Sequence, residues 1–150
     1  MSIFNTFGIN ASGMTAQRYR MDIISENVAN ANTTRTADGT PYRRKVVTFE
    51  QRGENVGSFS SFLGSASSAY RGQGVRVGKV MEDTWTQMNM VYDPSHPDAD
   101  ENGYVTGPNV NIVTEMTNLI DASRSYEANA TAFNASKSIA VKGLEMTGQS

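Results

Sequence analysis

The sequence predicts an α+β protein in which long N- and C-terminal helices pair as a coiled coil. Two observations lead to this prediction: apolar residues recur at heptad spacing near both ends, and short alternating segments typical of strands lie between them. We expect one discontinuous unit. Residues 1–32 and 110–150 form its terminal helical coiled-coil core, and residues 33–109 form a small β-rich middle region with long loops.

The C-terminal segment, Asn111 to Met146, carries the longer helical pattern. Alternating steps of three and four residues place two rows on one side of a helix. Ser123 and Lys137 interrupt one row, which favours a long helix packed on a shaped partner over a self-sufficient zipper. The rows are Ile112, Leu119, Tyr126, Phe133 and Ala140, and Met116, Ser123, Ala130, Lys137 and Leu144.

A second amphipathic helix is predicted near the N-terminus, from Ser2 to Asn30. The asparagine-rich run that begins at Asn27 ends it, because asparagine tolerates the left-handed conformation of a helix cap. We expect the two helices to be partners for each other, with the methionines forming an adaptable contact surface. The apolar residues that recur every seven positions are Phe7, Met14, Met21 and Val28, and Ile24 belongs to the adjacent row.

The middle of the chain predicts a small sheet. A strand is expected within residues 39–51, where β-branched and aromatic residues favour one, and within 75–80 and 87–92, where apolar and polar residues alternate. We expect Trp85 to anchor this sheet. Residues 53–74, rich in Gly and Ser, predict a long loop that orders on another subunit. Residues 93–108 predict a turn-rich loop because they contain several Pro and Gly.

Composition argues against most catalytic chemistry. The chain has no cysteine and one histidine, so disulfides, thiolate sites and histidine-pair metal sites are excluded. We find no nucleophile–base signature and expect no enzyme activity, cofactor or small-molecule substrate. No apolar run approaches the roughly 20 residues that span a bilayer. The first residues lack a basic segment followed by an apolar one, so we expect no cleavable secretory signal, and any export would use another route.

Charge is distributed unevenly along the chain. Residues 1–80 carry ten Lys or Arg against five Asp or Glu, and residues 81–150 carry three against ten. Such a bipolar subunit can attract copies of itself head to tail, although the charges can also serve only to solubilise two surfaces. The basic cluster at residues 43–45 is too small for a nucleic-acid surface, so we expect no nucleic-acid partner.

One acidic loop has the spacing of metal ligands. Asp98, Asp100, Asn102 and Gly103 match the first ligands and the glycine of a calcium loop. The match fails at Asn109, which occupies the position of the final bidentate carboxylate. We therefore favour an acidic turn with no metal, and keep a small calcium-dependent binding module as an alternative function.

Several stretches together resemble the bacterial flagellar basal-body rod proteins. They are NVANANTTR at 27–35, GYVTGPNVNIVTEM at 103–116 and RSYEAN at 124–129. YDPSHPDAD at 92–100 is similar, more narrowly, to the C-type proximal rod subunit. The resemblance covers nearly the whole chain, and residues 53–74 are its least diagnostic part.

The resemblance implies a structural subunit without enzyme activity that assembles helically into the torque-transmitting rod. It implies export by the flagellar type III apparatus into the periplasm, and partners among copies of itself, other rod subunits, membrane-ring components and the export gate. A secreted coiled-coil translocator or effector remains a second alternative. The residues expected at the assembly interface are Phe7, Met14, Met21, Ile24, Val28, Ile112, Met116, Leu119, Tyr126, Ala130, Phe133, Ala140 and Leu144.

Overall fold

The computed structural model describes residues 3–52 and 74–147. They form two helices and two pairs of antiparallel strands, which confirms the α+β class. The predicted Gly/Ser-rich loop lies outside the described residues except for Gly74. In chain order the elements are α1 (Ile3–Ala29), β1 (Lys45–Gln51), β2 (Val75–Glu82), β3 (Asn89–Tyr92), β4 (Tyr104–Gly107) and α3 (Ile112–Thr147).

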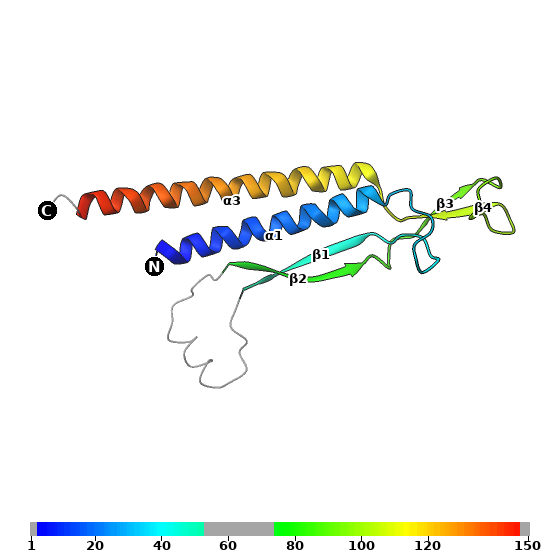
Figure 1. Cartoon of the computed structure of the whole chain (residues 1–150), viewed down its shortest axis with the longest axis horizontal. Coiled ribbons are helices and arrows are strands. Elements are labelled where there is room, and N and C mark those ends of the chain that lie inside the picture. Colours follow the sequence, from blue (N-terminus) through cyan, green and yellow to red (C-terminus); the bar gives the residue numbers. More distant parts are fainter. Residues whose placement is uncertain (1–2, 53–73, 148–150) are drawn as a thin grey trace, which may run out of the picture.

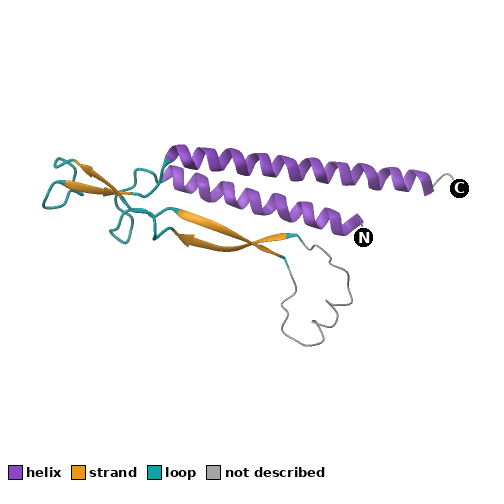
Figure 2. Cartoon of the chain, turned by 180° about the vertical axis from the view of Figure 1, so that it is seen from behind, coloured by secondary structure: helices purple, strands orange, loops and turns teal. Residues whose placement is uncertain are grey.

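The elements form an elongated molecule built along the two helices. α1 and α3 run antiparallel, side by side, and the β1–β2 ribbon lies along the opposite side of α1 (Figure 1). α1 is therefore the middle layer. The β3–β4 hairpin projects beyond the helix pair, at the end where α1 finishes and α3 begins (Figure 2). No helix in the described ranges is both long and apolar enough to cross a bilayer.

The helix ends follow local sequence chemistry. Asn111 caps α3, because its side-chain oxygen accepts hydrogen bonds from the backbone N–H groups of Val113 and Thr114 at 3.0 and 3.2 Å. α1 ends at Ala29, and the next turn closes with a bond from the Thr33 N–H to the Asn30 carbonyl. Both observed helices agree with the predicted ranges to within one residue at each end.

The face of α3 that packs on α1 differs from the predicted one. Leu119, Phe133 and Ala140 are half-buried, as one predicted row requires. The second contact row is Glu115, Ala122, Asn129 and Ser136, and not the predicted row that begins at Met116. Met116, Ile112 and Leu144 are 48%, 47% and 73% exposed, so they lie outside the α1–α3 contact, and their place at an assembly interface stays a prediction.

Small and polar residues occupy the true contact row because the two helices approach closely. Gly13 of α1 faces Asn129, and a Cβ at Gly13 would lie 2.6 Å from the Asn129 side-chain oxygen. Ala122 is completely buried at the same interface. Near the start of α1, Phe7 packs on Phe133 of α3 with ring centroids 5.1 Å apart. The heptad spacing of large apolar residues therefore predicted that α3 is a helix, but it did not predict which side of α3 packs on α1.

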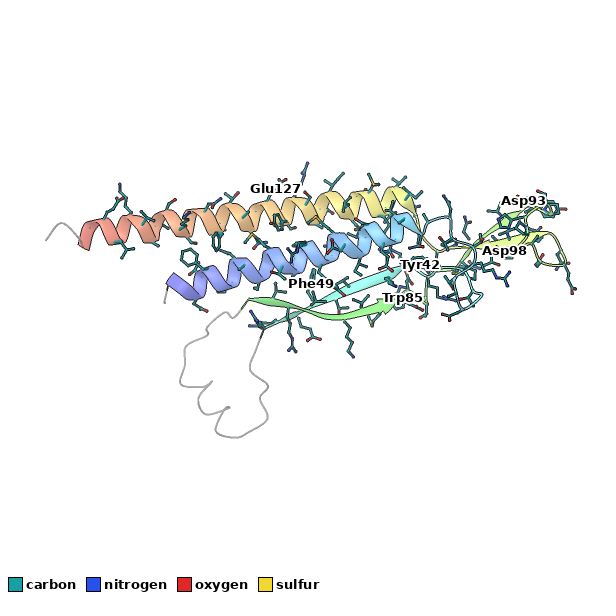
Figure 3. The ribbon with its side chains drawn as sticks, in the orientation of Figure 1. Tyr42, Phe49, Trp85, Asp93, Asp98 and Glu127 are labelled. Carbon is teal, nitrogen blue, oxygen red and sulfur yellow. The ribbon has the colours of Figure 1, made fainter. Side chains whose placement is uncertain are left out.

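The strands pair as two separate ribbons. β1 and β2 pair antiparallel with a register shift between Val47 and Phe49, and β3 pairs with β4. The prediction missed β4, which lies in the segment expected to be a loop. β4 is only four residues long, and it is flanked by Gly103 and Pro108, which are residue types typical of turns. Trp85 is 69% exposed, so it does not anchor the sheet (Figure 3).

The β1–β2 ribbon is attached to α1 near both of its ends. At one end, the Val75 N–H donates a 3.1 Å hydrogen bond to the Ser12 hydroxyl. At the other, the Lys45 N–H donates a 2.8 Å bond to the Asn27 side-chain oxygen. Between these points Ala16 and Ile24 of α1 are buried. α1 therefore has contacts on two sides, while α3 is covered on one.

The Gly13–Asn129 contact gives a stability prediction. Gly13→Ala should destabilise the native chain but stabilise an Asn129→Ala background, because alanine improves helix propensity by about 1 kcal/mol once the clash is removed. Urea unfolding of the four chains, followed by circular dichroism, measures the coupling between the sites, which should reach roughly 1 kcal/mol. Additive effects of the two substitutions would contradict the close approach.

Candidate functional site

The described residues contain one cluster of buried polar side chains around a half-buried arginine, and it lies where the helix pair meets the strands. It joins the end of α1, the segment entering β1, the end of β2 and the start of α3. We call it the polar junction. Its members are Asn27, Tyr42, Arg44, Asp83, Asn109 and Glu115.

Asn27 connects three segments through a fully bonded amide. Its nitrogen donates to the Lys45 carbonyl at 2.9 Å and to Glu115 Oε2 at 3.0 Å. Its oxygen accepts the Tyr42 hydroxyl at 2.9 Å and the Lys45 N–H at 2.8 Å. The residue is 1% exposed, and every donor and acceptor of its amide is used. Asn27 therefore fixes the end of α1 against both β1 and α3.

Glu115 is a fully buried carboxylate in the first turn of α3. Arg44 Nε donates to its Oε1 at 2.9 Å, Arg44 Nη2 forms an ion pair with the same oxygen at 2.9 Å, and Asn27 donates to Oε2. A buried carboxylate is stable only when such partners replace its hydration. The position also favours a negative charge, because it lies near the positive end of the helix dipole.

Asp83 organises the chain after β2. Its carboxylate accepts the Thr86 N–H at 2.9 Å and the Thr86 hydroxyl at 2.7 Å, and lies 3.6 Å from Arg44 Nη1. Asn109 completes the connection. Its amide donates to the Asp83 carbonyl at 2.9 Å and accepts the Arg44 N–H at 2.8 Å. The start of α3 is thus tied to both strands of the ribbon.

Two junction residues have shifted pKa values. Burial, and then the charges of Glu26, Glu115 and Glu82, raise the pKa of Tyr42 to about 12, so its hydroxyl remains a donor at neutral pH. Burial alone would raise the pKa of Asp83, but the hydrogen bonds from Thr86 and Trp85 and the Arg44 charge lower it overall. These shifts follow from structural bonding, and the arrangement holds segments together.

The acidic loop between β3 and β4 also uses its carboxylates internally. Asp98 accepts the Thr34 hydroxyl at 2.9 Å and lies 3.5 Å from Arg35 Nη1. Asp100 accepts the N–H groups of Asn102 and Tyr104 at 2.9 and 2.8 Å. These bonds account for both acids as loop-forming groups. Within the ranges 3–52 and 74–147, no three His, Cys, Asp or Glu side chains form a metal-binding group.

The predicted interface residues divide into a covered and an exposed set. On α1, Ile24 is buried, and the other four, Phe7, Met14, Met21 and Val28, are half-buried. On α3, Leu119, Ala130, Phe133 and Ala140 are half-buried and Tyr126 is 36% exposed. Ile112, Met116 and Leu144 are largely exposed. The structure therefore leaves part of the predicted set open to other molecules.

α3 and the β3–β4 hairpin present large apolar side chains to solvent. One group lies along the first half of α3: Ile112, Val113, Met116 and Ile120, which are 47–76% exposed. We call it the outer stripe, because α1 leaves these side chains exposed. The hairpin adds Met90, Val91 and Tyr92, and the last turns of α3 add Ile139, Val141 and Met146. Large apolar side chains that gather in exposed patches commonly mark contact surfaces, so these three groups indicate such surfaces.

Sequence reasoning missed the polar junction. Asn27 was interpreted only as part of a helix terminator, and Arg44 only as part of a basic cluster. Asn109 entered only as a failed calcium ligand. The sequence carried only a weak signal. Glu115 falls in the same helical row as Ala122, Asn129 and Ser136, and a charge in a row that packs on another helix requires a bonding partner. Identifying that partner requires the tertiary structure, because Arg44 is 71 residues away.

The Glu115–Arg44 pair gives a second stability prediction. Glu115→Ala should lower the free energy of unfolding by about 3–5 kcal/mol, because it leaves Arg44 and Asn27 without their acceptor. Glu127→Ala is the control, since Glu127 is an exposed glutamate on the outer side of α3 (Figure 3) and should change stability by less than about 0.5 kcal/mol. Equal losses in urea unfolding of the two variants would refute a stabilising junction.

Asp83 gives a pH prediction. Its folded-state pKa lies below the ordinary 3.8, so its stabilising contribution is complete above that value. The contribution is lost as pH falls below 3.8 through the lowered folded-state pKa. The difference in unfolding free energy between native chain and Asp83→Asn should be constant above about pH 5 and shrink towards pH 2. Chemical unfolding at several pH values tests this, and a difference that stays constant down to pH 2 would count against it.

Comparisons with known proteins match the two regions that supply Asn27, Asn109 and Glu115 of the polar junction. Residues 9–35, which contain Asn27, match the family described as flagella basal body rod protein. Residues 101–146, which contain Asn109 and Glu115, match the family described as flagellar basal body rod FlgEFG protein C-terminal.

Full-length relatives agree with these matches. The flagellar basal-body rod protein FlgC of Bacillus subtilis is 47% identical, over 97% of this chain and 99% of the relative. FlgC of Borreliella burgdorferi is 45% identical over 93% of each chain, and FlgC of Escherichia coli O157:H7 is 39% identical over 97% and 98%. At this identity over nearly the whole length, the chain belongs to the FlgC family of flagellar basal-body rod proteins.

Proposed function

We propose that the protein assembles helically with copies of itself and with other rod subunits into the shaft that transmits torque and encloses the export channel. Its family is one of structural flagellar rod proteins and not of enzymes, which confirms the interpretation of the sequence. Its place is the flagellar basal body, among other rod components.

The exposed apolar surface of α3 is the observation that supports assembly most strongly. Ile112, Val113, Met116 and Ile120 lie on consecutive turns, and α1 covers a different side of the helix. Burying one such side chain contributes about 1.5–3 kcal/mol. A tube of repeated subunits would bury the outer stripe in every copy. The predicted assembly residues Ile112, Met116 and Leu144, which α1 leaves exposed, belong to this proposal.

The rigid connection at the polar junction supports a role in force transmission. Asn27, Arg44 and Glu115 tie α1, β1 and α3 together at one point. A load applied to the β-rich region, residues 33–109, would therefore reach the terminal helical core, residues 1–32 and 110–150, through several bonds in parallel. We further propose that these helices complete a coiled coil with those of neighbouring subunits.

The finer cellular placement belongs to the same proposal. The protein crosses into the periplasm through the flagellar type III apparatus, without signal cleavage. Membrane-ring and export-gate components contact it at the base of the rod. Neither alternative function, a calcium-dependent binding module or a secreted translocator or effector, gains support from the family matches.

Ile120→Asp tests assembly through the outer stripe. The isolated variant should keep its fold, because Ile120 is 53% exposed and faces away from α1, but a buried aspartate would block subunit contact. In a strain that lacks the native chain, electron microscopy should show few or no rods, and motility should be lost.

Thr131→Asp supplies the matched control, since it places the same charge at an exposed polar position of α3. Rods and motility should persist in that strain at equal cellular protein levels. Normal rods with Ile120→Asp would refute the outer stripe as an assembly surface. If the deletion strain itself builds complete rods, the proposed function is wrong.

A further inference from the structure

A groove lies at the hairpin end of the molecule, between the β3–β4 hairpin and the first turn of α3. Its volume is about 760 Å³. Val91 and Val105 line it from the hairpin, and Ile112 and Val113 line it from α3. Val105 is buried, and the other three are 47–76% exposed. We call this the hairpin groove, and it continues into the outer stripe at Ile112 and Val113.

The other end of the molecule carries a helix without an opposing helix. Phe7 lies against Phe133, and the described part of α1 begins at Ile3, so the C-terminal part of α3 extends past it (Figure 1). We call residues 139–147 the helix end. Ile139, Val141 and Met146 are 68%, 46% and 76% exposed there. Helical geometry puts Ile139 and Met146 on one side and Val141 on the opposite side. Apolar groups therefore surround most of this helix end.

The groove and the helix end fit each other in size. The nine residues of the helix end form a rod about 13 Å long and about 10 Å wide with its side chains, or roughly 1,000 Å³, so the groove of about 760 Å³ has room for most of it. Both surfaces also carry exposed apolar residues that nothing covers within the described chain. One of them is concave and the other convex.

Charge favours the same pairing. Asp93 lines the hairpin groove, and the whole stretch from residue 81 to 110 contains acids but no Lys or Arg. Lys137 lies just before the helix end and Lys142 lies within it, against a single acid, Glu145. Lys142 lies 3.8 Å from Glu145 and its side chain is 81% exposed, so it can also reach a partner's carboxylate.

We propose that the helix end of one subunit docks in the hairpin groove of the next, along the long axis of the molecule. This inference rests on the proposed assembly function and names the surfaces that carry it. The partner is a second copy of this chain. Because the two surfaces differ and lie at opposite ends, the contact is head to tail and can repeat into an open filament.

A disulfide experiment tests this contact cleanly, because the chain has no cysteine of its own. The variant Val113→Cys/Met146→Cys carries one thiol at the groove and one at the helix end. The two positions are 33 residues apart on one helix, or roughly 50 Å, so they cannot join within a chain. Mild oxidation of basal bodies from cells producing only this variant should give a ladder of linked chains.

Single variants supply the controls. Val113→Cys alone and Met146→Cys alone should give at least tenfold less linked product, since the proposal brings unlike positions together. Val113→Cys/Thr131→Cys should behave like the single variants, because Thr131 lies in the middle of α3. Dimers of either single variant at the level of the double variant would indicate a symmetric contact and overturn the proposal.

The experiment separates this inference from the proposed function. Intact rods without a ladder would overturn the docking contact but leave the rod role standing. If rods from cells that produce the cysteine-free parent chain do not contain that chain, both the docking contact and the rod role are wrong. If cysteine at Val113 prevents assembly, Val91→Cys/Met146→Cys replaces it, because Val91 lines the same groove and is 52% exposed. A ladder from either pair supports the contact, and intact rods with no ladder from the second pair overturn it.

Discussion

The buried charge of Glu115 is the constraint on which the rest of the structure depends. A carboxylate with no exposure to water must be surrounded by donors, and Arg44 and Asn27 supply them from two other segments. The three residues can meet only if α1, β1 and α3 reach one point in a fixed register. That register determines where the hairpin projects and which side of α3 faces α1. The polar junction thus determines how α1, β1 and α3 are arranged, while the two helices determine how long the molecule is.

The interior of the isolated chain is small for its length. The fully enclosed apolar residues of the described chain, such as Ala16, Ile24 and Ala122, are few and mostly short, and several of the largest apolar side chains face outward. Close packing through Gly13 and Ala122 gives dispersion contacts but little buried apolar area. Much of the apolar surface that stabilises an ordinary domain internally is here available to neighbours. The subunit and its assembly therefore share one hydrophobic interior.

Sequence periodicity predicted the two helices to within a residue, and alternation located β1, β2 and β3. It could not determine the rotation of α3, because Met116 and Leu144 have the same hydrophobicity whether they face α1 or a neighbouring subunit. The hairpin partner β4 was hidden among glycine and proline residues that also mark loops. The polar junction was unpredictable for another reason: its members are ordinary surface residue types that become buried only when distant segments meet.

The one-sided location of the junction has a mechanical consequence for the helix pair. The β1–β2 ribbon is fastened to α1 near both ends, at Ser12 and at Asn27. Among the described residues, a buried amide–carboxylate bond ties α3 to α1 at Glu115, and toward the far end Phe7 packs on Phe133. Thermal fluctuations should therefore peel α3 from α1 starting at that far end. The two helices would stay together near the β3–β4 hairpin and separate at the opposite end, where the described part of α1 begins.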